Sequence, residues 1–440
     1  MHKSVTAVEV RLWNRRVGAV ALDPRLGFHA FEYDPDFVRL GIEIAPLAMP
    51  LAQAGAPFVF TDLPTPTFKR LPAMLADALP DDFGNALIDM WMAARGVEKR
   101  AITSLDRLAY MGRRGMGALE FRPARGPNVA SHTAIKLGRL VESARRVVQG
   151  QIDTDPHAQA ALAQIIQVGT SAAGARAKAA ILWNPETHEI RAGQFDADPG
   201  FEHWLLKFDG MGADRELGAS QDYGRIEYAY SLMARAAGID MAPCRLLEEG
   251  GRAHFMTRRF DRAVDAEGRT VKHHMQSLCA MAHLDYKQKA THDYAQLLLT
   301  LQGLKLGHDA LAEAFRRMVF NVAAANCDDH SKNFSFLLPN EQREWRLAPA
   351  YDITHAHNPQ GEWTYQHLTG VNGKFGGITR DDLLRIADRF AIGPAPKIID
   401  KVMDAVADWP EFARQAGLDQ QIITDIRADF ELNSFNNHGR

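Results

Sequence analysis

The hydrophobic pattern of the chain changes at about His274, and this change limits the folds that the chain can adopt. Before that point, stretches such as Thr6–Leu22 and Ala179–Trp183 predict short β-strands between helices. After it, apolar residues recur at helical spacing almost throughout. The 440 residues also exceed the roughly 250–300 residues at which a single hydrophobic core stops growing. We therefore expect an α+β protein with more than one core.

Three regions are expected along the chain. Residues 1–145 combine predicted strands with amphipathic helices, and the polar stretch Asp153–His157 resembles a linker after them. Residues 146–265 hold strands and one predicted helix, Tyr223–Ala237, with apolar residues at helical spacing. Residues 266–440 are predicted as helices, interrupted by two polar segments that each contain a short strand.

Composition and charge exclude several classes of protein. The 51 basic and 54 acidic residues give a net charge of -3, whereas a dedicated nucleic-acid binder is usually basic. Three scattered cysteines (Cys244, Cys279 and Cys327) match no disulfide or metal spacing and fit a reducing cytosol. The N-terminus lacks an apolar stretch of the signal-peptide kind, and no run approaches the ~18 apolar residues of a membrane span. We expect a cytoplasmic protein without a membrane contact.

The strongest chemical signal is the polar segment Asn326–Asn333, between a predicted apolar helix and the strand Phe334–Leu338. Phosphoryl transfer needs an acid beside the attacking hydroxyl and oxygen ligands for Mg2+. Protein kinases supply both from one loop, in which an Asp and an Asn stand five positions apart. Asp328 and Asn333 have this spacing, whereas Asp329 does not. A solvated turn also favours Asp, Asn and Ser, so this segment alone leaves both interpretations open.

A second acid, further along the chain, favours a catalytic site over a solvated turn. Asp352 follows the apolar stretch Leu347–Ala350 shortly downstream of the first segment. The kinase arrangement requires a second metal-binding acid after the catalytic loop. A turn aspartate is the alternative, but the occurrence of both elements in this order favours a metal site.

Two further elements lie upstream, in the order that a nucleotide site needs. Lys207 stands inside the apolar strand Trp204–Phe208, where an ammonium group is costly to desolvate without an anionic partner. Nucleotide phosphates would be one such partner, and Glu227 on the next predicted helix another. The small residues of Gly169–Lys178 would let backbone N–H groups approach phosphates. An edge-strand lysine and a helix cap are the alternative interpretations of these two elements.

Two other strings imitate kinase motifs without the right context. Asp82-Phe83-Gly84 spells the kinase magnesium tripeptide, but it precedes every other element and is better interpreted as a helix entry. The string Gly112–Gly117 is rich in glycine, but no strand, turn and helix surround it in the required order. Neither string is predicted to take part in catalysis.

The joint pattern of small-residue loop, strand lysine, helix glutamate, D-x-H-x-x-N loop and Tyr-Asp resembles the HipA family of bacterial toxin kinases. The D-x-H-x-x-N loop is also similar to that of phosphatidylinositol 3-kinases. The strings Leu79–Gly84 and Gly112–Phe121 look like the first subdomain of the family, so the resemblance covers nearly the whole chain. It implies a two-lobed, protein-kinase-like α+β fold related to the phosphatidylinositol kinases. An N-terminal β-rich subdomain (1–145) would precede a kinase N-lobe with ATP loop and hinge (146–265) and an all-helical C-terminal lobe (266–440).

The resemblance also implies roles for single residues. Asp328 would be the catalytic base or orienter of the substrate hydroxyl, Asn333 and Asp352 would hold Mg2+, and Glu227 would form a supporting ion pair with Lys207. The residues implied in ATP binding are Ala173, Gly174, Ala175, Lys178, Lys207, Arg258, Phe260, His330, Lys332 and Tyr351.

Regulation and partners are likewise implied by the resemblance. Ser171 occupies the position of a serine that is autophosphorylated in the family, which turns the kinase off, and Thr170 is an adjacent hydroxyl. The added negative charge of about two would repel the phosphates of ATP. The implied partners are a DNA-binding helix-turn-helix antitoxin (HipB-like), operator DNA through that antitoxin only, and a protein substrate of the aminoacyl-tRNA synthetase class. The phosphorylation would stall translation and favour dormancy, which underlies bacterial persistence.

Two alternative functions remain at this stage. One is a kinase that acts on a small molecule or a lipid, although the chain shows no basic amphipathic helix for a membrane surface. The other is a catalytically idle co-repressor that only binds the antitoxin. The presence of Asp328, Asn333, Asp352 and Lys207 together disfavours the idle form, because a binding module has no need of all four.

Overall fold

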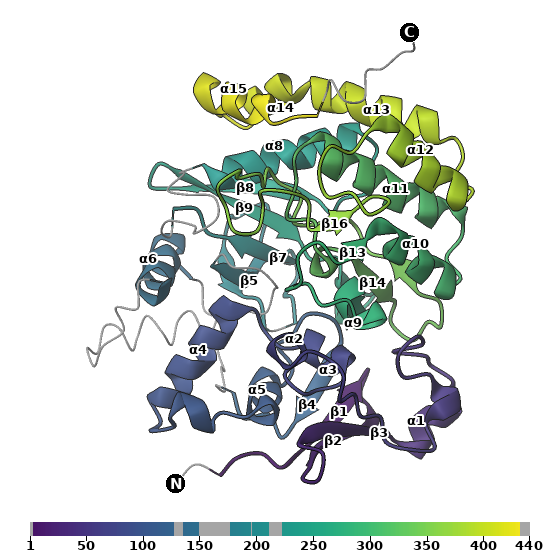
Figure 1. Cartoon of the computed structure of the whole chain (residues 1–440). Coiled ribbons are helices and arrows are strands. Elements are labelled where there is room, and N and C mark those ends of the chain that lie inside the picture. The colour runs from purple at the N-terminus through teal and green to yellow at the C-terminus, as the bar shows by residue number, and fades with distance from the viewer. Residues whose placement is uncertain (1–2, 127–134, 149–176, 195, 211–221, 432–440) are drawn as a thin grey trace. The chain divides into compact units, whose positions relative to one another are not determined.

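A computed structural model describes residues 3–126, 135–148, 177–194, 196–210 and 222–431 (Figure 1). The chain divides into two compact units. The first comprises Met1–Gly212, Thr257–His283 and Phe336–Trp345, and the second Ala213–Met256, Leu284–Ser335 and Arg346–Arg440. In the described part of the chain, no helix combines the length and the apolar character needed to span a membrane.

The first unit begins with an antiparallel four-stranded sheet in the order β3-β2-β1-β4. The turn between β1 and β2 is formed by Trp13 and Asn14, both with positive φ, as a two-residue hairpin turn requires. Apolar side chains on alternate positions of β1 are buried. The strands are β1 (Ala7–Leu12), β2 (Arg15–Asp23), β3 (Phe28–Tyr33) and β4 (Leu119–Arg122).

Short helices follow in the same unit. The side chain of Asp81 accepts a hydrogen bond of 2.7 Å from the backbone N–H of Gly84, and this cap starts α4 at Asp82. The interpretation of Asp82-Phe83-Gly84 as a helix entry is thereby confirmed. The helices are α1 (Pro35–Leu40), α2 (Thr65–Phe68), α3 (Ala73–Asp77), α4 (Asp82–Ala93), α5 (Ser104–Met111), α6 (Leu137–Val148) and α9 (Leu278–Ala282).

A second group of antiparallel strands in the first unit carries the predicted lysines. Strand β5 (Lys178–Trp183) pairs with β6 (Ile190–Ala192) on one side and with β7 (Glu202–Lys207) on the other. All six residues of β5 are buried, which explains why its sequence is a continuous apolar run after Lys178. Further along, β10 (Arg262–Val264) and β11 (Thr270–Lys272) form a hairpin, and β12 (His274–Ser277) neighbours β14 (Ser335–Leu338).

The second unit is mainly helical (Figure 1). Helix α8 packs against α13 and α14, and α11 packs against both α10 and α13. Trp409 is fully buried and meets the ring of Tyr230 edge-on at 5.2 Å between centroids. The helices are α8 (Tyr223–Ala236), α10 (Tyr294–Gly303), α11 (His308–Ala323), α12 (Arg380–Arg389), α13 (Ala395–Ala407), α14 (Trp409–Gln415) and α15 (Gln420–Ala428).

Short strands interrupt these helices. Strand β13 (His292–Asp293) pairs in parallel with β16 (Thr369–Gly370), and β8 (Cys244–Glu249) neighbours β9 (Arg252–Arg258). Strand β15 (Arg346–Leu347) precedes the segment that carries Asp352. The region after residue 266 is therefore mainly helical, as predicted, but the expectation of an all-helical lobe omits these short strands.

Candidate functional site

The segment Asn326–Asn333, here called the acidic loop, follows the end of α11. The chain leaves the helix through Ala325, which has a φ of 52°. The backbone N–H of Cys327 then donates to the carbonyl of Ala356 at 3.1 Å, and the carbonyl of Cys327 accepts from the N–H of Leu368 at 3.1 Å. The start of the acidic loop is thus held by two segments that lie 30 to 40 residues later in the second unit.

Asp329 fixes the middle of the acidic loop. Its carboxylate is buried and accepts hydrogen bonds from the backbone N–H groups of Leu368 (2.9 Å) and Thr369 (3.1 Å) and from the hydroxyl of Tyr294 (2.8 Å). The ring Nδ1 of His367 donates to it at 3.0 Å. Burial opposes a charged ring, but the Asp329 carboxylate outweighs this and raises the pKa of His367 well above its usual value. Asp329 is therefore an acid that holds the loop in place through four hydrogen bonds.

Asp328 is placed differently, although it is the next residue in the chain. Its side chain is 49% exposed, and its Oδ1 lies 3.7 Å from Nε2 of His330. Its carbonyl oxygen accepts a hydrogen bond of 2.7 Å from Nδ2 of Asn333. The same loop thus buries one acid as an anchor and leaves the other reachable by a substrate.

Asn333 and Asp352 line one small pocket of the second unit, together with Asp329 and Tyr351. The amide nitrogen of Asn333 is used by the bond to the Asp328 carbonyl, so its amide oxygen is the atom left for a metal. The oxygen Oδ1 of Asn326 lines the same pocket, is buried, and has no hydrogen-bond partner among the described residues. Carboxylate and amide oxygens are the ligands that Mg2+ prefers. The residues present therefore fit the predicted metal.

Tyr351 joins the acidic loop to the segment that carries Asp352. Its hydroxyl donates to the carbonyl of Lys332 at 2.6 Å and lies 2.5 Å from the hydroxyl of Ser335. Asp352 follows with a φ of 52°, in the left-handed region that L-residues adopt only when their surroundings require it. This backbone turn sets the direction in which the Asp352 carboxylate leaves the chain.

The two remaining predicted residues of the acidic loop share a neighbour. The ring of His330 lies 5.3 Å from that of Tyr286, and Nζ of Lys332 lies 5.0 Å from the centre of the same ring. An ammonium group is attracted to the face of an aromatic ring. Tyr286 thus holds the imidazole and the ammonium on the same side of the loop.

In the first unit, Lys207 lies at the end of β7 directly opposite Lys178 at the start of β5. Both residues are buried, at 8% and 4% exposure. Directly opposed residues of an antiparallel pair project from the same face, and like charges there repel. The register of β5 and β7 thus brings the two predicted phosphate-binding lysines together.

The predicted hinge residues also lie in the first unit. Arg258 is half exposed, and its Nη1 lies 3.4 Å from the Glu202 carboxylate. The backbone N–H of Arg259 donates to the carbonyl of His203 at 2.9 Å, and Phe260 follows at intermediate exposure. The contact of this segment with adenine stays a prediction.

The other predicted residues are only partly covered by the structure. Glu227 is buried in α8 of the second unit, and its pairing with Lys207 remains a prediction. The predicted ATP-covering and autophosphorylation residues Ser171, Ala173, Gly174 and Ala175, with the neighbouring Thr170, lie outside the described residues.

Comparison with known proteins defines the family. The model of the HipA-like C-terminal domain matches residues 170–410, and that of the HipA N-terminal domain matches residues 8–122. The chain belongs to the HipA family. The HipA fold is also evident from HipA of Shewanella oneidensis MR-1, solved with HipB and its operator DNA, at a TM-score of 0.64 and 16% identity over 96% of this chain and 95% of that one.

Curated relatives cover only part of this HipA-family chain. Two proteins of Sinorhizobium fredii (strain NBRC 101917 / NGR234), Y4mE and Y4dM, carry kinase names. The identity is 28% over 28% of this chain and 30% of Y4mE, and 26% over 38% of this chain and 44% of Y4dM. The matches thus span less than half the length of either relative.

The supporting contacts of Asp329 in this HipA-family chain were not predicted. His367 lies 38 residues after Asp329, and Tyr294 lies 35 residues before it. No local spacing links a histidine and a tyrosine to an acid at such separations. The sequence also did not predict that Lys178 lies directly opposite Lys207, because this pairing depends on the register of β5 and β7.

Proposed function

We propose that this HipA-family chain is a serine/threonine protein kinase that transfers the γ-phosphoryl group of ATP to a protein hydroxyl. The observation that carries the proposal is the acidic loop, in which Asn333 is hydrogen-bonded to the backbone of Asp328 while sharing a pocket with Asp352. This arrangement separates a half-exposed acid from a pair of oxygen ligands. These are the two parts that phosphoryl transfer requires of a protein.

Each residue then has one role in the proposed reaction. The substrate oxygen attacks the γ-phosphorus, the bond from that phosphorus to the β,γ-bridging oxygen breaks, and ADP leaves. Asp328 orients the hydroxyl and accepts its proton, which later passes to water. Asn333 and Asp352 hold Mg2+, which would neutralise the charge on the phosphate oxygens. Lys178 and Lys207 contact the phosphates.

The further roles follow from the family and are proposed on that basis. His330 and Lys332 lie beside the phosphates, Tyr351 lies beside the nucleotide, and the backbone at Arg258 and Phe260 meets adenine. Ala173, Gly174 and Ala175 cover the ATP, Glu227 pairs with Lys207, and autophosphorylation of Ser171 switches the kinase off.

The partners are proposed from the same source. The related HipA was solved with HipB and operator DNA, which supports a helix-turn-helix antitoxin as the neutralising partner of this chain. We propose that operator DNA is bound only through that antitoxin. An aminoacyl-tRNA synthetase is the proposed class of substrate.

The decisive experiment incubates the full chain with Mg2+, labelled ATP and a bacterial lysate, and identifies phosphorylated proteins by mass spectrometry. We expect a serine or threonine of one or a few proteins to be labelled, and Ser171 or Thr170 to be labelled in the chain itself. Transfer of label to small molecules alone would contradict a protein kinase. Absence of any transfer, with the chain folded and ATP bound, would favour the idle co-repressor.

Substitution of Asp352 by glutamine is expected to weaken Mg2+-dependent ATP binding at least about 100-fold, because a charged metal ligand is lost. Glutamine carries no charge and is one methylene longer than aspartate. Titration calorimetry with ATP, in Mg2+ and again in EDTA, measures the effect.

The matched control for this substitution is Asp400→Asn, which removes a 55% exposed carboxylate from α13 in the same unit. It should bind Mg2+-ATP as the wild type does. Equal affinity of the Asp352→Gln variant and the control would remove Asp352 from the metal site.

A further inference from the structure

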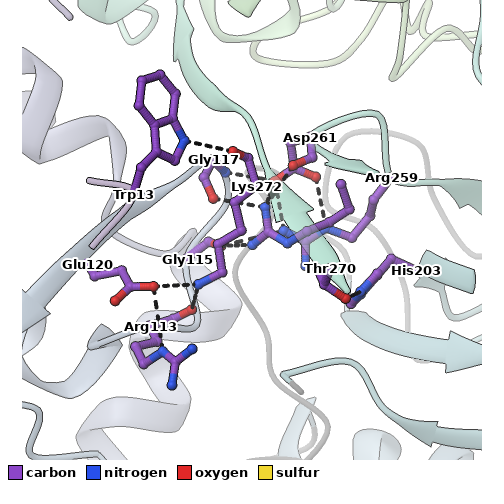
Figure 2. Close-up of polar contacts among 11 residues, drawn as sticks. Trp13, Arg113, Gly115, Gly117, Glu120, His203, Arg259, Asp261, Thr270 and Lys272 are labelled. Carbon is purple, nitrogen blue, oxygen red and sulfur yellow. Dashed lines mark hydrogen bonds and ion pairs between the residues drawn. The ribbon is translucent and has the colours of Figure 1, made fainter. Parts of the chain in front are cut away.

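A cavity of about 460 Å3 lies within the first unit, apart from the residues assigned above to phosphate and metal binding. The loop after α5, the start of β7 and the hairpin β10–β11 all contribute to its wall (Figure 2). Neither Lys178 nor Lys207 lines it. The cavity is unusual in its charge, because the cationic side chains in its wall are Arg113, Arg114, Arg259, Arg262 and Lys272, whereas Asp196 is the one carboxylate there among the described residues.

Two of these cations, Arg259 and Arg262, are held in place by the buried acid Asp261, and we call this arrangement the clamp (Figure 2). Asp261 is fully buried and receives hydrogen bonds from Arg259 (3.0 and 2.8 Å) and from Nη1 of Arg262 (2.8 Å). The backbone N–H of Gly117 donates to the same carboxylate at 2.7 Å. Both guanidinium groups are therefore fixed before any ligand arrives, which lowers the entropic cost of binding.

The acids near the cavity do not balance its cations. Asp261 neutralises one of the two buried arginines, and Glu120 pairs with Lys272 at 2.9 Å and with Arg113 at 3.5 Å. With Asp196 included and Arg114 left aside, the four cations Arg113, Arg259, Arg262 and Lys272 face three carboxylates, so cations outnumber acids among the described residues around the cavity. Burial, together with the charge of Arg259, lowers the pKa of Arg262 to about 10.

Some N–H groups of Arg259 and Arg262 remain available as hydrogen-bond donors to a ligand. The hydrogen bonds of Arg259 use its Nε and Nη2, and those of Arg262 use its Nη1 and Nη2. Among the described residues, Nη1 of Arg259 and Nε of Arg262 therefore have no hydrogen-bond partner. Guanidinium donors of this kind bind phosphate oxygens with charge-assisted hydrogen bonds.

A buried histidine adds a second, independent indication of a ligand. His203 lines the cavity at 5% exposure, and its Nε2 lies 3.1 Å from the hydroxyl of Thr270. That hydroxyl already accepts from the N–H of Ala197 at 2.8 Å, so it can donate its own proton to Nε2. The proton of the neutral ring then sits on Nδ1, which is buried and has no partner among the described residues. Burial, followed by the charges of Arg259 and Arg262, lowers the pKa of His203 to about 3, which keeps the ring neutral.

We propose that this cavity is a binding site for a small anion of the phosphate class, held by Arg113, Arg259, Arg262 and the Nδ1–H of His203. A phosphate group offers several oxygens to donors that converge from different directions, and its negative charge suits a wall in which cations outnumber acids. The four residues that hold the anion differ from those assigned to the nucleotide, although Arg259 stands between the proposed hinge residues Arg258 and Phe260. The inference does not depend on kinase activity.

Titration calorimetry with inorganic phosphate and with pyrophosphate tests the site, at constant ionic strength set with chloride. The proposed nucleotide site is first filled with Mg2+ and a non-hydrolysable ATP analogue, so that a phosphate bound there is not counted. We expect saturable binding of one anion per chain. Acetate is the comparison probe, and binding of acetate as tight as that of phosphate would overturn the phosphate class.

Variants locate the bound anion. Arg262 is unsuitable for substitution because its loss would disturb the clamp around Asp261. Arg113→Gln is preferable, since this side chain is 69% exposed, and His203→Phe removes the buried donor while keeping a ring. Each variant should bind phosphate about tenfold more weakly, because each loses one hydrogen bond to a charged group.

The control is Arg100→Gln, which removes an 86% exposed arginine of the same unit that pairs with Glu98. It should bind phosphate as the wild type does. Equal affinity in all three variants, or no binding once the nucleotide site is filled, would overturn the proposal.

Discussion

The Asp328→Gln variant is expected to transfer phosphate about 10^2–10^4 times more slowly than the wild type, the usual range for loss of a general acid or base. Glutamine is one methylene longer than aspartate, and its amide accepts no proton at neutral pH. The carboxylate of Asp328 is half exposed, so the fold should persist after the substitution. Initial rates of label transfer to the substrate found in the lysate measure the loss.

Binding separates this effect from that of the metal ligands. Asp328 uses its backbone carbonyl to hold Asn333, and the substitution leaves that carbonyl in place. The Asp328→Gln variant should therefore bind Mg2+-ATP with wild-type affinity, in contrast to Asp352→Gln. Undiminished transfer by Asp328→Gln would refute the assignment, and a loss shared equally by Asp400→Asn would point to a general defect.

The largest effect on stability is expected for Asp261→Asn. This change leaves Arg259 and Arg262 charged, buried and without their carboxylate, and breaking such a buried ion pair costs about 3–5 kcal/mol. The hydrogen bond from Gly117 also becomes weaker. Urea or guanidinium unfolding of the full chain measures the free energy of unfolding.

Asp265→Asn is the matched control for this measurement. Asp265 also pairs with an arginine, Arg269, at 2.8 Å, but the pair lies at the surface of the first unit. Salt bridges of this kind contribute little, so the control should unfold as the wild type does. A similar stability of both variants would show that the clamp around Asp261 does not hold this unit together.

The pH dependence of stability should report the same clamp. Burial alone would raise the pKa of Asp261, but Arg259 and Arg262 outweigh it and hold the pKa well below its usual range. The unfolded chain binds a proton at Asp261 below about pH 4. The stabilisation is therefore complete above that pH and is lost as the pH falls further towards the folded pKa. Asp261→Asn should lack this acid-dependent loss.

Much of the candidate site was predictable because its residues are close in sequence. Asp328 and Asn333 share one loop, and Asp352 follows after the short strands β14 and β15, so their spacing was enough to single them out as candidates. The structure adds the reason why Asp328 and Asp329 differ, since the partners of Asp329 come from α10 and from the start of β16. These contacts join parts of the chain that no periodic pattern connects.

The fold was predictable to a similar degree. Strands β5 and β7 and helix α8 lie within one or two residues of their predicted ranges, because the strands are short apolar runs and the helix has apolar residues at helical spacing. The clamp around Asp261 was not foreseen. It joins Gly117 to a residue 144 positions later, and charged residues in a loop give no sign in the sequence that they will be buried.

The anchoring of Asp329 has a consequence for how this molecule can be turned on and off. A carboxylate that satisfies two amide groups, a phenol and an imidazolium in a dry interior cannot leave them without exposing all four to an unfavourable environment. We therefore expect the loop that bears Asp328 to stay assembled in every state of the proposed kinase. If the chain has an inactive state, we expect it to arise from another segment that blocks the reactants, with the groups of the acidic loop still in place.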